Sequence, residues 1–341
     1  MSIELANRQP ASNTRPLLDV KALQIRFRTH DGLQTVKAVD GVDFAVLPGE
    51  TFGLIGESGS GKTTLGRALV GLLAPTAGTI LHDGINLAHL SRRKARSYRR
   101  NFQIVFQDPN AALDPRSTIL ESVREPLDII GETPRQERMR RALAALDRVG
   151  LSTEIAARYP HELSGGQKQR VNIARVLTLR PRLVVCDEAV AGLDVSIRGE
   201  VLNLLAELQR DFGLTYVFIT HDLSVVAHIS DRIGVMYLGK LMELGPAAAV
   251  VDRPLHPYTM ALLSAEPVPL PSTFRRNRRI VLEGEIPSPI DPPSGCRFRT
   301  RCPHAKPICT ETMPERREMA PDHWVACHFA GQIGFDMTKM S

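Results

Sequence analysis

The stretch TFGLIGESGSGKTT, residues 51–64, decides the fold. Its first five residues fit a short buried strand, and a helix is predicted from about Lys62 to Leu73. Between them, GESGSGKT (56–63) fits the phosphate-loop pattern G-x-x-x-x-G-K-[ST]. Glycines let backbone N–H groups curl around phosphate oxygens, and the helix N-terminus adds the positive end of a dipole. The expected nucleotide-binding residues of this stretch are Gly56, Ser58, Gly59, Ser60, Gly61, Lys62, Thr63 and Thr64.

A second segment, LVVCDE (183–188), supplies the acids that such a site needs. Four apolar residues predict a buried strand, whose end delivers two carboxylates to the rim of the sheet where α/β folds bind ligands. We expect Asp187 to reach Mg²⁺ together with Thr63, and Glu188 to hold or activate the attacking water. Without a phosphate loop in the same chain, the segment would read as a strand that ends in a capping acid.

Strand and helix patterns alternate along most of the chain. Strands are predicted at 101–107, 183–189 and 215–222, and the pattern between 108 and 179 is helical. This alternation predicts an α/β fold with a largely parallel sheet, into which a helical block is inserted. After about Asp252 proline becomes dense, which indicates a linker followed by a small further unit.

Composition places the chain among ordinary globular proteins. It has 341 residues, 43% hydrophobic and 23% charged, which excludes a disordered or fibrous chain. No apolar run is long enough to span a membrane, and the first residues lack the apolar core of a secretory signal. The net charge of +6 permits nucleic acid or anionic lipid as a partner. Basic runs at 92–100 and 275–279 fit either a solvated surface or such a contact, and only Tyr98 places an aromatic among them.

The segment LSGGQ (163–167) resembles the signature of the ATP-binding cassette (ABC) ATPases. Other motifs of that family follow in the same order: Gln107 ends a strand, Asp194 lies in AGLD, and His221 follows the strand YVFIT. The resemblance implies an α/β, RecA-like P-loop core with an inserted α-helical subdomain and a small cysteine-rich C-terminal extension. The expected bounds are 1–16 for a flexible N-terminus, 17–252 for the nucleotide-binding domain, about 108–179 for its helical subdomain, and 253–341 for the extension.

The resemblance also implies how ATP and Mg²⁺ are held. In this family two cassettes pair head to tail, so the signature of one chain would face the phosphate loop of the other. The signature residues expected to contact that ATP are Ser164, Gly165, Gly166 and Gln167. AGLD departs from the commoner SALD but keeps Asp194.

Three residues are expected to catalyse hydrolysis: Glu188, His221 and Gln107. His221 would contact the γ-phosphate. Gln107 would sense Mg²⁺ and link the helical subdomain to a membrane partner. Phe27 lies where the family places an aromatic side chain that stacks on adenine, although a core strand residue is the alternative reading.

Four of the five cysteines lie near the C-terminus, in the spacing C-x5-C-x6-C-x17-C: Cys296, Cys302, Cys309 and Cys327. Four thiolates can hold zinc or an iron–sulfur cluster, and these gaps are wider than zinc pairs usually have. The segments SGCRFRTRCPHAKPIC, HPYT (256–259) and IPSPIDPPSG resemble the extension of oligopeptide and dipeptide importer ATPases. Members of that subfamily carry a [4Fe–4S] cluster at such a quartet, with free thiols or disulfides as the further alternative. Cys186 reads as a small core residue, and His304, His323 and His328 read as surface residues.

These observations predict the ATP-hydrolysing motor subunit of a membrane importer for dipeptides or oligopeptides. Expected partners are a second ABC ATPase subunit, two transmembrane permease subunits and an extracytoplasmic substrate-binding protein, with the chain peripheral on the cytoplasmic face of the inner membrane. The alternative is a soluble ABC ATPase acting on nucleic acid, which would need a long arm between Gln107 and Leu163, where only about 55 residues lie. A regulatory or scaffolding cassette that does not hydrolyse ATP is a further alternative. The catalytic motif residues argue against it, because all of them are present: Lys62, Asp187, Glu188 and His221. The sequence does not identify the transported substrate, and it does not distinguish a homodimer from a heterodimer.

Overall fold

The computed structural model describes residues 15–29, 31–265 and 280–334, so the expected flexibility of 1–14 and the basic run 275–279 lie outside the described residues. Within these ranges the strands form two sheets. The larger has eight strands in the order β11-β12-β10-β9-β3-β8-β7-β6. They are β3 (Thr51–Ile55), β6 (Phe102–Val105), β7 (Leu183–Asp187), β8 (Thr215–Thr220), β9 (Arg232–Tyr237), β10 (Lys240–Pro246), β11 (Arg317–Ala320) and β12 (His323–Val325).

The centre of the larger sheet is parallel, which confirms the predicted α/β fold. Strand β3 pairs in parallel with β8 and β9, and β7 pairs in parallel with β6 and β8. All residues of β3, β7 and β8 are buried, as expected for parallel strands covered on both faces. The strand expected at 101–107 is shorter, Phe102–Val105, so that Gln107 lies in the loop beyond it.

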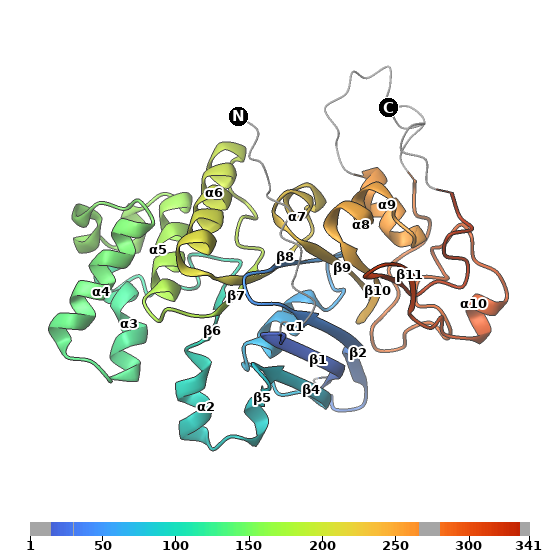
Figure 1. The fold of residues 1–341 in the computed structure, drawn as a ribbon, viewed down its shortest axis with the longest axis horizontal. Helices are drawn as coiled ribbons and strands as arrows, with labels where there is room; N and C mark the ends of the chain where they lie inside the picture. Colours follow the sequence, from blue (N-terminus) through green and yellow to red (C-terminus); the bar gives the residue numbers. More distant parts are fainter. Residues whose placement is uncertain (1–14, 30, 266–279, 335–341) are drawn as a thin grey trace.

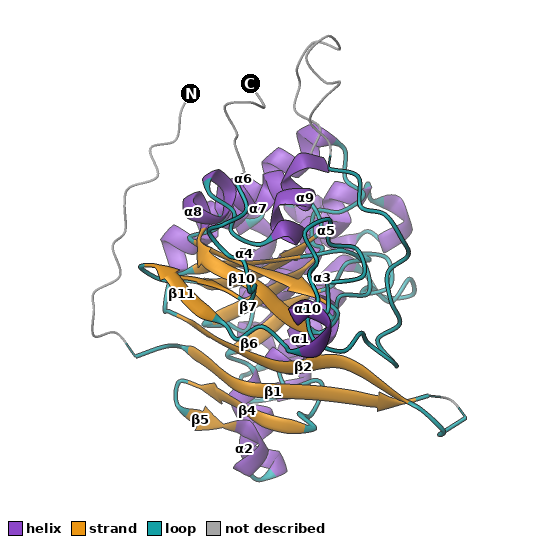
Figure 2. Ribbon diagram, turned by 90° about the vertical axis from the view of Figure 1, so that its right-hand side faces the viewer, coloured by secondary structure: helices purple, strands orange, loops and turns teal. Residues whose placement is uncertain are grey.

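A four-stranded antiparallel sheet lies below the larger sheet (Figure 2). It consists of β1 (Leu18–Arg28), β2 (Thr35–Val46), β4 (Ala77–His82) and β5 (Ile85–Asn86), in the order β2-β1-β4-β5. Helix α1 (Lys62–Leu69) packs against strands of both sheets and shares a core with them through Leu65 and Leu69. The helix stops before the expected Leu73, because the chain turns at Gly71 with φ 74°.

The helices gather in two regions. Helices α3 (Ile119–Ile130), α4 (Arg135–Arg148) and α5 (Gly165–Leu177) pack together as the inserted helical block, at the opposite end of the molecule from the C-terminal extension (Figure 1). Helix α2 (Arg92–Arg99) carries the first basic run, which is largely exposed. The remaining helices are α6 (Val195–Phe212), α7 (Leu223–Ile229), α8 (Ala247–Asp252), α9 (Pro257–Ala265) and α10 (Ile308–Glu311), with short turns η1 (Leu87–His89), η2 (Thr153–Ala157) and η3 (Pro160–Glu162).

The C-terminal extension continues the larger sheet. Its strand β12 pairs antiparallel with β10, where Leu244 lies opposite Trp324. The buried carboxylate of Glu243 on β10 accepts hydrogen bonds from the backbone N–H of Leu255 and of His256, each at 2.9 Å. It also contacts His323 Nε2 at 2.7 Å. The prediction that His323 is a surface residue is therefore wrong: it is 3% exposed.

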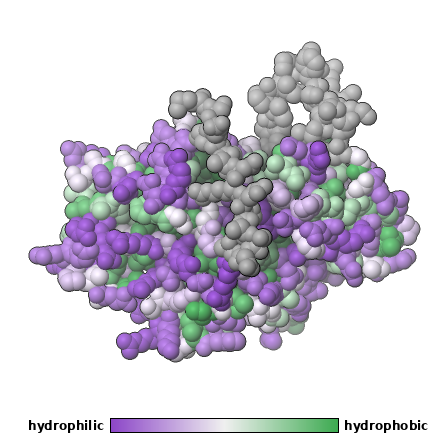
Figure 3. Space-filling view, viewed as in Figure 1, coloured by the Kyte–Doolittle hydropathy of each residue, from purple (hydrophilic) through white to green (hydrophobic). Residues whose placement is uncertain are grey.

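The molecular surface is mostly hydrophilic on the face shown in Figure 3, with separate hydrophobic areas between the polar side chains. Among the described residues, no helix combines the length and apolar character needed to cross a membrane.

Candidate nucleotide site

The phosphate loop joins β3 to α1 and is shaped by its glycines. Gly61 caps α1 with φ 103°, and Gly56 has φ 153°. A Cβ added to Gly56 would lie 2.1 Å from the backbone oxygen of Met236, and one on Gly61 would lie 2.1 Å from that of Ala38. Only glycine fits these two positions, so the loop lies close to β2 and β9.

Lys62 is held at the centre of this loop. Its side chain is buried, and Nζ donates to the backbone oxygen of Gly56 at 2.6 Å and of Glu57 at 2.9 Å. Desolvation lowers the pKa of Lys62, and the carboxylates of Glu188 and Asp187 act in the opposite direction. A partly desolvated ammonium among backbone dipoles is suited to bind phosphate oxygens.

Asp187 and Thr63 bring two hard oxygen ligands together. Asp187 ends β7, and its Oδ1 accepts a hydrogen bond from Thr63 Oγ1 at 3.0 Å. Burial raises the pKa of Asp187, the Thr63 hydroxyl lowers it, and the nearby Glu188 raises it further. A carboxylate and a hydroxyl are ligands that Mg²⁺ accepts beside phosphate oxygens. The third expected magnesium ligand, Gln107, has a different hydrogen-bond partner.

Glu188 is that partner, and it is held from two sides. Gln107 Nε2 donates to its Oε2 at 2.6 Å, and His221 Nδ1 lies 3.2 Å from its Oε1. Its backbone has φ 49°, and its N–H donates to Ile219 at 2.8 Å. A non-glycine residue in this left-handed region is strained, and such strain is often found at functional sites. Two side chains that follow other strands, Gln107 after β6 and His221 after β8, thus fix the Glu188 carboxylate beside the phosphate loop.

These side chains open on a cavity of about 540 Å³. Phe27 lines this cavity and is 39% exposed, so the alternative of a core strand residue is wrong. Val36, Ala38 and Pro289 also line the cavity, and sequence reasoning missed them. The alternation of β2 could have indicated Val36 and Ala38, whereas Pro289 is remote in the chain. Among the site residues predicted from the sequence, those that line the cavity are Phe27, Ser58, Gly59, Gly61, Lys62, Thr63, Thr64, Gln107, Glu188 and His221.

The signature segment lies outside this cavity. Ser164 caps α5, and its hydroxyl and the side chain of Gln167 form a reciprocal capping box. Gly166 packs closely on α6, since an added Cβ would lie 2.6 Å from Ile197 Cγ2. Asp194 precedes α6 and is exposed. The structure therefore separates the phosphate loop from Ser164, Gly165, Gln167 and Asp194 within one chain.

The four C-terminal cysteines lie in one region of the extension. They are free thiols, and the backbone N–H of Cys296 donates to Cys309 at 2.8 Å. Burial raises the pKa of Cys296 and of Cys302 to about 11, and the neighbouring thiols act in the same direction. The described residues contain no group of three or more His, Cys, Asp or Glu side chains arranged to hold a metal ion. Cys186, in contrast, is fully buried in β7.

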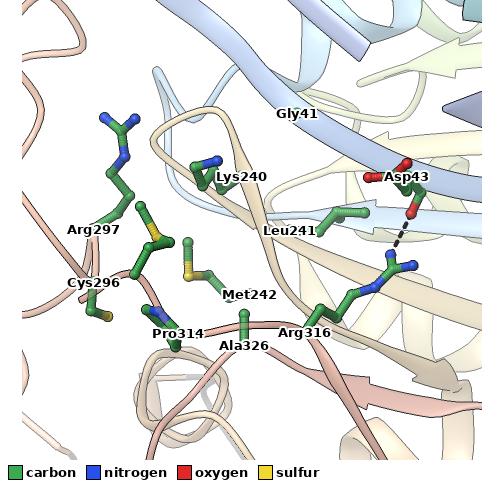
Figure 4. A pocket seen from close by; sticks show the side chains of 11 residues that line it. Gly41, Asp43, Lys240, Leu241, Met242, Cys296, Arg297, Pro314, Arg316 and Ala326 are labelled. Carbon is green, nitrogen blue, oxygen red and sulfur yellow. Dashed lines mark hydrogen bonds between the residues drawn. The ribbon is translucent and has the colours of Figure 1, made fainter. Parts of the chain in front are cut away.

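A small cavity of about 150 Å³ marks the junction of the extension with β2 and β10. Figure 4 shows Lys240 and Arg297 on one side of it and Asp43 and Arg316 on the other. Arg297 is buried, and its guanidinium pairs with Asp40 of β2. This ion pair, with the hydrogen bond from Arg316 to the backbone oxygen of Asp43, attaches the extension to the smaller sheet.

Comparison with known proteins agrees with this geometry. Residues 39–191 match the family described as ABC transporter, and residues 242–309 match the C-terminal region of oligopeptide/dipeptide transporters. The chain belongs to the ABC transporter ATPases, in their oligopeptide/dipeptide branch. The ABC ATPase core with its helical insertion, predicted from the sequence, is thereby confirmed.

Two curated relatives extend over most of this ABC ATPase. The oligopeptide transport ATP-binding protein AppF of Bacillus subtilis is 52% identical over 93% of this chain and 98% of the relative. The oligopeptide transport ATP-binding protein OppF of Escherichia coli is 50% identical over 87% of this chain and 92% of the relative.

Solved ABC structures share the fold of the nucleotide-binding part. The cassette MJ0796, in a dimeric post-hydrolysis state bound to ADP and Pi, matches with a TM-score of 0.61 and 31% identity, over 67% of this chain and 98% of that one. The chain cbiO1 from Clostridium perfringens, part of the complex cbiONQ, matches with a TM-score of 0.62 and 32% identity, over 70% of this chain and 91% of that one.

Proposed function

We propose that this ABC ATPase is the ATP-hydrolysing motor subunit of a peptide importer, peripheral on the cytoplasmic face of the inner membrane. The observation that supports it best is the placement of Glu188. Its carboxylate is held by Gln107 at 2.6 Å and faces His221 at 3.2 Å, and it lines one cavity with Lys62 and Thr63. Peptide import is proposed because AppF and OppF are named as oligopeptide transport ATP-binding proteins.

In this proposal each residue has one role in hydrolysis. Lys62 and the loop amides bind the β- and γ-phosphates, and Phe27 stacks on adenine. Thr63 and Asp187, with Gln107, hold Mg²⁺, which neutralises charge on the phosphates when bound.

Glu188 orients the attacking water and accepts its proton, while Gln107 and His221 keep the carboxylate in position. Burial raises the pKa of Asp187, so a nearby cation would stabilise its ionised form.

Two chains are needed to complete the site. Ser164 and Gln167 are exposed or half-buried at the start of α5 and do not line the cavity of their own chain. We propose that they, with Gly165, Gly166 and Asp194, close over ATP bound to a second ABC ATPase subunit, identical or related. A helix N-terminus supplies backbone donors for the γ-phosphate in that arrangement.

The loop after Gln107 provides a mechanical link to the helical block. Asn110 accepts a hydrogen bond from Lys168 at 2.9 Å, and the backbone oxygen of Pro109 accepts one from Asn172 at 3.3 Å. Both donors lie on α5, which begins at the signature. A change at Gln107 on ATP binding would therefore move α5 and, through the helical block, two permease subunits that receive peptide from an extracytoplasmic binding protein.

We further propose that Cys296, Cys302, Cys309 and Cys327 hold a [4Fe–4S] cluster rather than zinc. Zinc would need its sulfurs in a tight tetrahedron at about 2.3 Å from one ion. A four-iron cluster accepts thiolates that stand farther apart, and Cys302, Cys309 and Cys327 are close enough to Cys296 to raise its pKa, in addition to the larger effect of burial. Iron, acid-labile sulfide and zinc content of protein purified without oxygen would test this. Four iron and four sulfide with a broad band near 400 nm support the cluster, and one zinc per chain contradicts it.

Transport itself is tested in lipid vesicles that contain the chain with its permease subunits. ATP hydrolysis should rise when peptide-loaded binding protein is added, and it should be absent with Lys62→Ala. Stimulation by DNA or RNA, with no response to the loaded binding protein, would contradict the proposal and favour the nucleic-acid alternative. The helices between Gln107 and Leu163 already disfavour that alternative, because α3 and α4 have only 12 and 14 residues.

A further inference from the structure

The C-terminal extension touches the nucleotide site at two separate points. Arg301, next to Cys302, contacts the phosphate loop, and Pro289 lines the nucleotide cavity. We propose that the extension is a wall of the ATP site, with Arg301 as a positioning residue for the phosphate loop and Pro289 as a contact for the base end of the nucleotide. This inference rests on the proposed function, since it assumes that the cavity binds ATP.

Arg301 forms a two-pronged ion pair with Glu57 in the loop. Its Nη1 lies 2.6 Å from Glu57 Oε2, and its Nη2 lies 3.1 Å from Oε1. The Arg301 side chain is 9% exposed and that of Glu57 is 23% exposed. The guanidinium also lies over the ring of Tyr237, at 5.9 Å from the ring centre. Such planar, partly buried pairs have a defined geometry that exposed lysine pairs lack.

Every polar group of Glu57 is engaged. Its backbone N–H donates to the Tyr258 hydroxyl at 2.8 Å, and its backbone oxygen accepts from Lys62 Nζ at 2.9 Å. Its carboxylate is held by Arg301. The second residue of the phosphate loop is thus fixed from three directions, two of which come from residues C-terminal to β10. Gly56 and Gly59, on either side of Glu57 and Ser58, give this part of the loop backbone freedom to move if these contacts are lost.

The charge of Glu57 explains why its partner matters for ATP. Its carboxylate is one of the three that act on the pKa of Lys62. With Arg301 present the carboxylate is neutralised. Without Arg301 it would compete with phosphate for the Lys62 ammonium and repel the phosphates themselves. The ion pair therefore leaves the Lys62 ammonium available to bind phosphate.

Pro289 lies beside the part of the cavity that β2 and Phe27 line. Its backbone oxygen accepts a hydrogen bond from Lys37 of β2 at 3.0 Å. Lys37 lies between Val36 and Ala38, which line the cavity, and β1 carries Phe27 on the same side. The proline ring is rigid and apolar, so it suits the face or edge of a base or a ribose rather than phosphate. The two contacts thus lie toward different parts of one nucleotide.

The experiment separates these two contacts with two ligands. Affinity for ATP and for inorganic tripolyphosphate, each with Mg²⁺, is measured on full-length protein carrying Glu188→Gln to prevent turnover. Arg301→Met should weaken both ligands by about tenfold, within the usual range of coupling between two sites. Pro289→Gly should weaken ATP by about threefold and leave tripolyphosphate unchanged, because it removes a base contact worth about 0.7 kcal/mol at RT of about 0.6 kcal/mol.

Matched controls come from the same segment. Arg299→Met removes a guanidinium whose hydrogen bonds among the described residues go to Ser294, and Pro292→Gly removes a proline outside the cavity. Both should bind ATP like the parent. Since Arg301→Met could unfold the extension, Glu57→Gln is added to it. This double variant removes both charges and should recover affinity to within about threefold of the parent, given that only the unpaired carboxylate opposes phosphate.

The outcomes are distinct. If Arg301→Met and Pro289→Gly bind both ligands like the parent while Lys62→Ala does not, the extension is no part of the site and this inference is overturned. If the double variant stays as weak as Arg301→Met alone, the charge argument is overturned. If Lys62→Ala also binds ATP like the parent, the proposed nucleotide site itself fails.

A reciprocal measurement begins with the parent protein. Coupling between two sites must act in both directions. Saturating ATP and Mg²⁺ should slow amide hydrogen exchange in 289–301 of the parent, and Arg301→Met should abolish that slowing. Unchanged exchange on saturation would contradict the proposal.

Discussion

The buried imidazole of His256 predicts that the protein loses stability in mild acid. Full burial lowers its pKa from 6.5 to about 4, and the nearby Glu243 carboxylate only partly opposes this. Its Nδ1 accepts a hydrogen bond from the backbone N–H of Tyr258 at 3.0 Å. The folded chain therefore holds this ring neutral at a pH where the unfolded chain would protonate it.

The sign and size follow from proton linkage. Between the two pKa values the unfolded state binds more protons, so stability rises with pH there and is lost as pH falls. At pH 5 the unfolded imidazole is about 30-fold more protonated than neutral, while the folded one is mostly neutral. The expected loss between pH 7.5 and pH 5 is about 2 kcal/mol of unfolding free energy.

Urea unfolding at these two pH values measures the loss. The single tryptophan, Trp324, lies on β12 opposite Leu244 and is a convenient fluorescence probe of this region. His256→Asn keeps an acceptor for the Tyr258 N–H but does not titrate, so its pH dependence should be smaller by about 2 kcal/mol. His82 is buried as well, with a lowered pKa, and its contribution cancels because both proteins retain it. An equal pH dependence in parent and variant would refute the reasoning.

Three further predictions concern the nucleotide site and its supports. Asp187→Asn should raise the melting temperature of nucleotide-free protein by about 2 °C, as expected for a gain of about 1 kcal/mol, because it removes a buried charge; it should also abolish Mg²⁺-dependent hydrolysis. Gly166→Ala should cost about 1–3 kcal/mol, because its methyl would press on Ile197, and Ile197→Ala should restore part of that loss. Phe27→Ala should weaken ATP about fivefold but not tripolyphosphate, since stacking on a base contributes about 1 kcal/mol or more, whereas Phe27→Trp should retain binding. Calorimetry, urea unfolding and equilibrium binding, respectively, check these outcomes.

Much of the candidate site could be predicted because its parts are local in sequence. The phosphate loop needs glycines at fixed positions, and steric contact with Met236 and Ala38 shows why at Gly56 and Gly61. The meeting of Gln107, Glu188 and His221 follows from parallel strands, whose carboxyl ends share one edge of the sheet. The resemblance to the ABC ATPases singled out Gln107 and His221, and the order of the parallel strands explains why they meet Glu188.

The C-terminal extension was harder to predict, because its contacts join distant residues. The ion pair of Arg301 with Glu57 spans 244 positions, and the hydrogen-bond contact of His323 with Glu243 spans 80. No periodicity indicates such partners. His323 follows the charged Asp322 in a segment without a clear strand pattern and therefore resembled a surface residue, yet β12 extends the larger sheet and buries it. The dense prolines suggested a separate unit, whereas strand pairing joins the extension to the core.

The most direct test of the account is the rate of ATP hydrolysis by Glu188→Gln, measured together with its affinity for ATP. We predict a loss of at least about 100-fold in rate, because the variant lacks a carboxylate that can accept the proton of the attacking water. ATP should bind at least as tightly as to the parent, and the variant should associate into dimers that persist with ATP and Mg²⁺. Hydrolysis at the parental rate would contradict the assignment of Glu188 as the base, and with it the proposed mechanism.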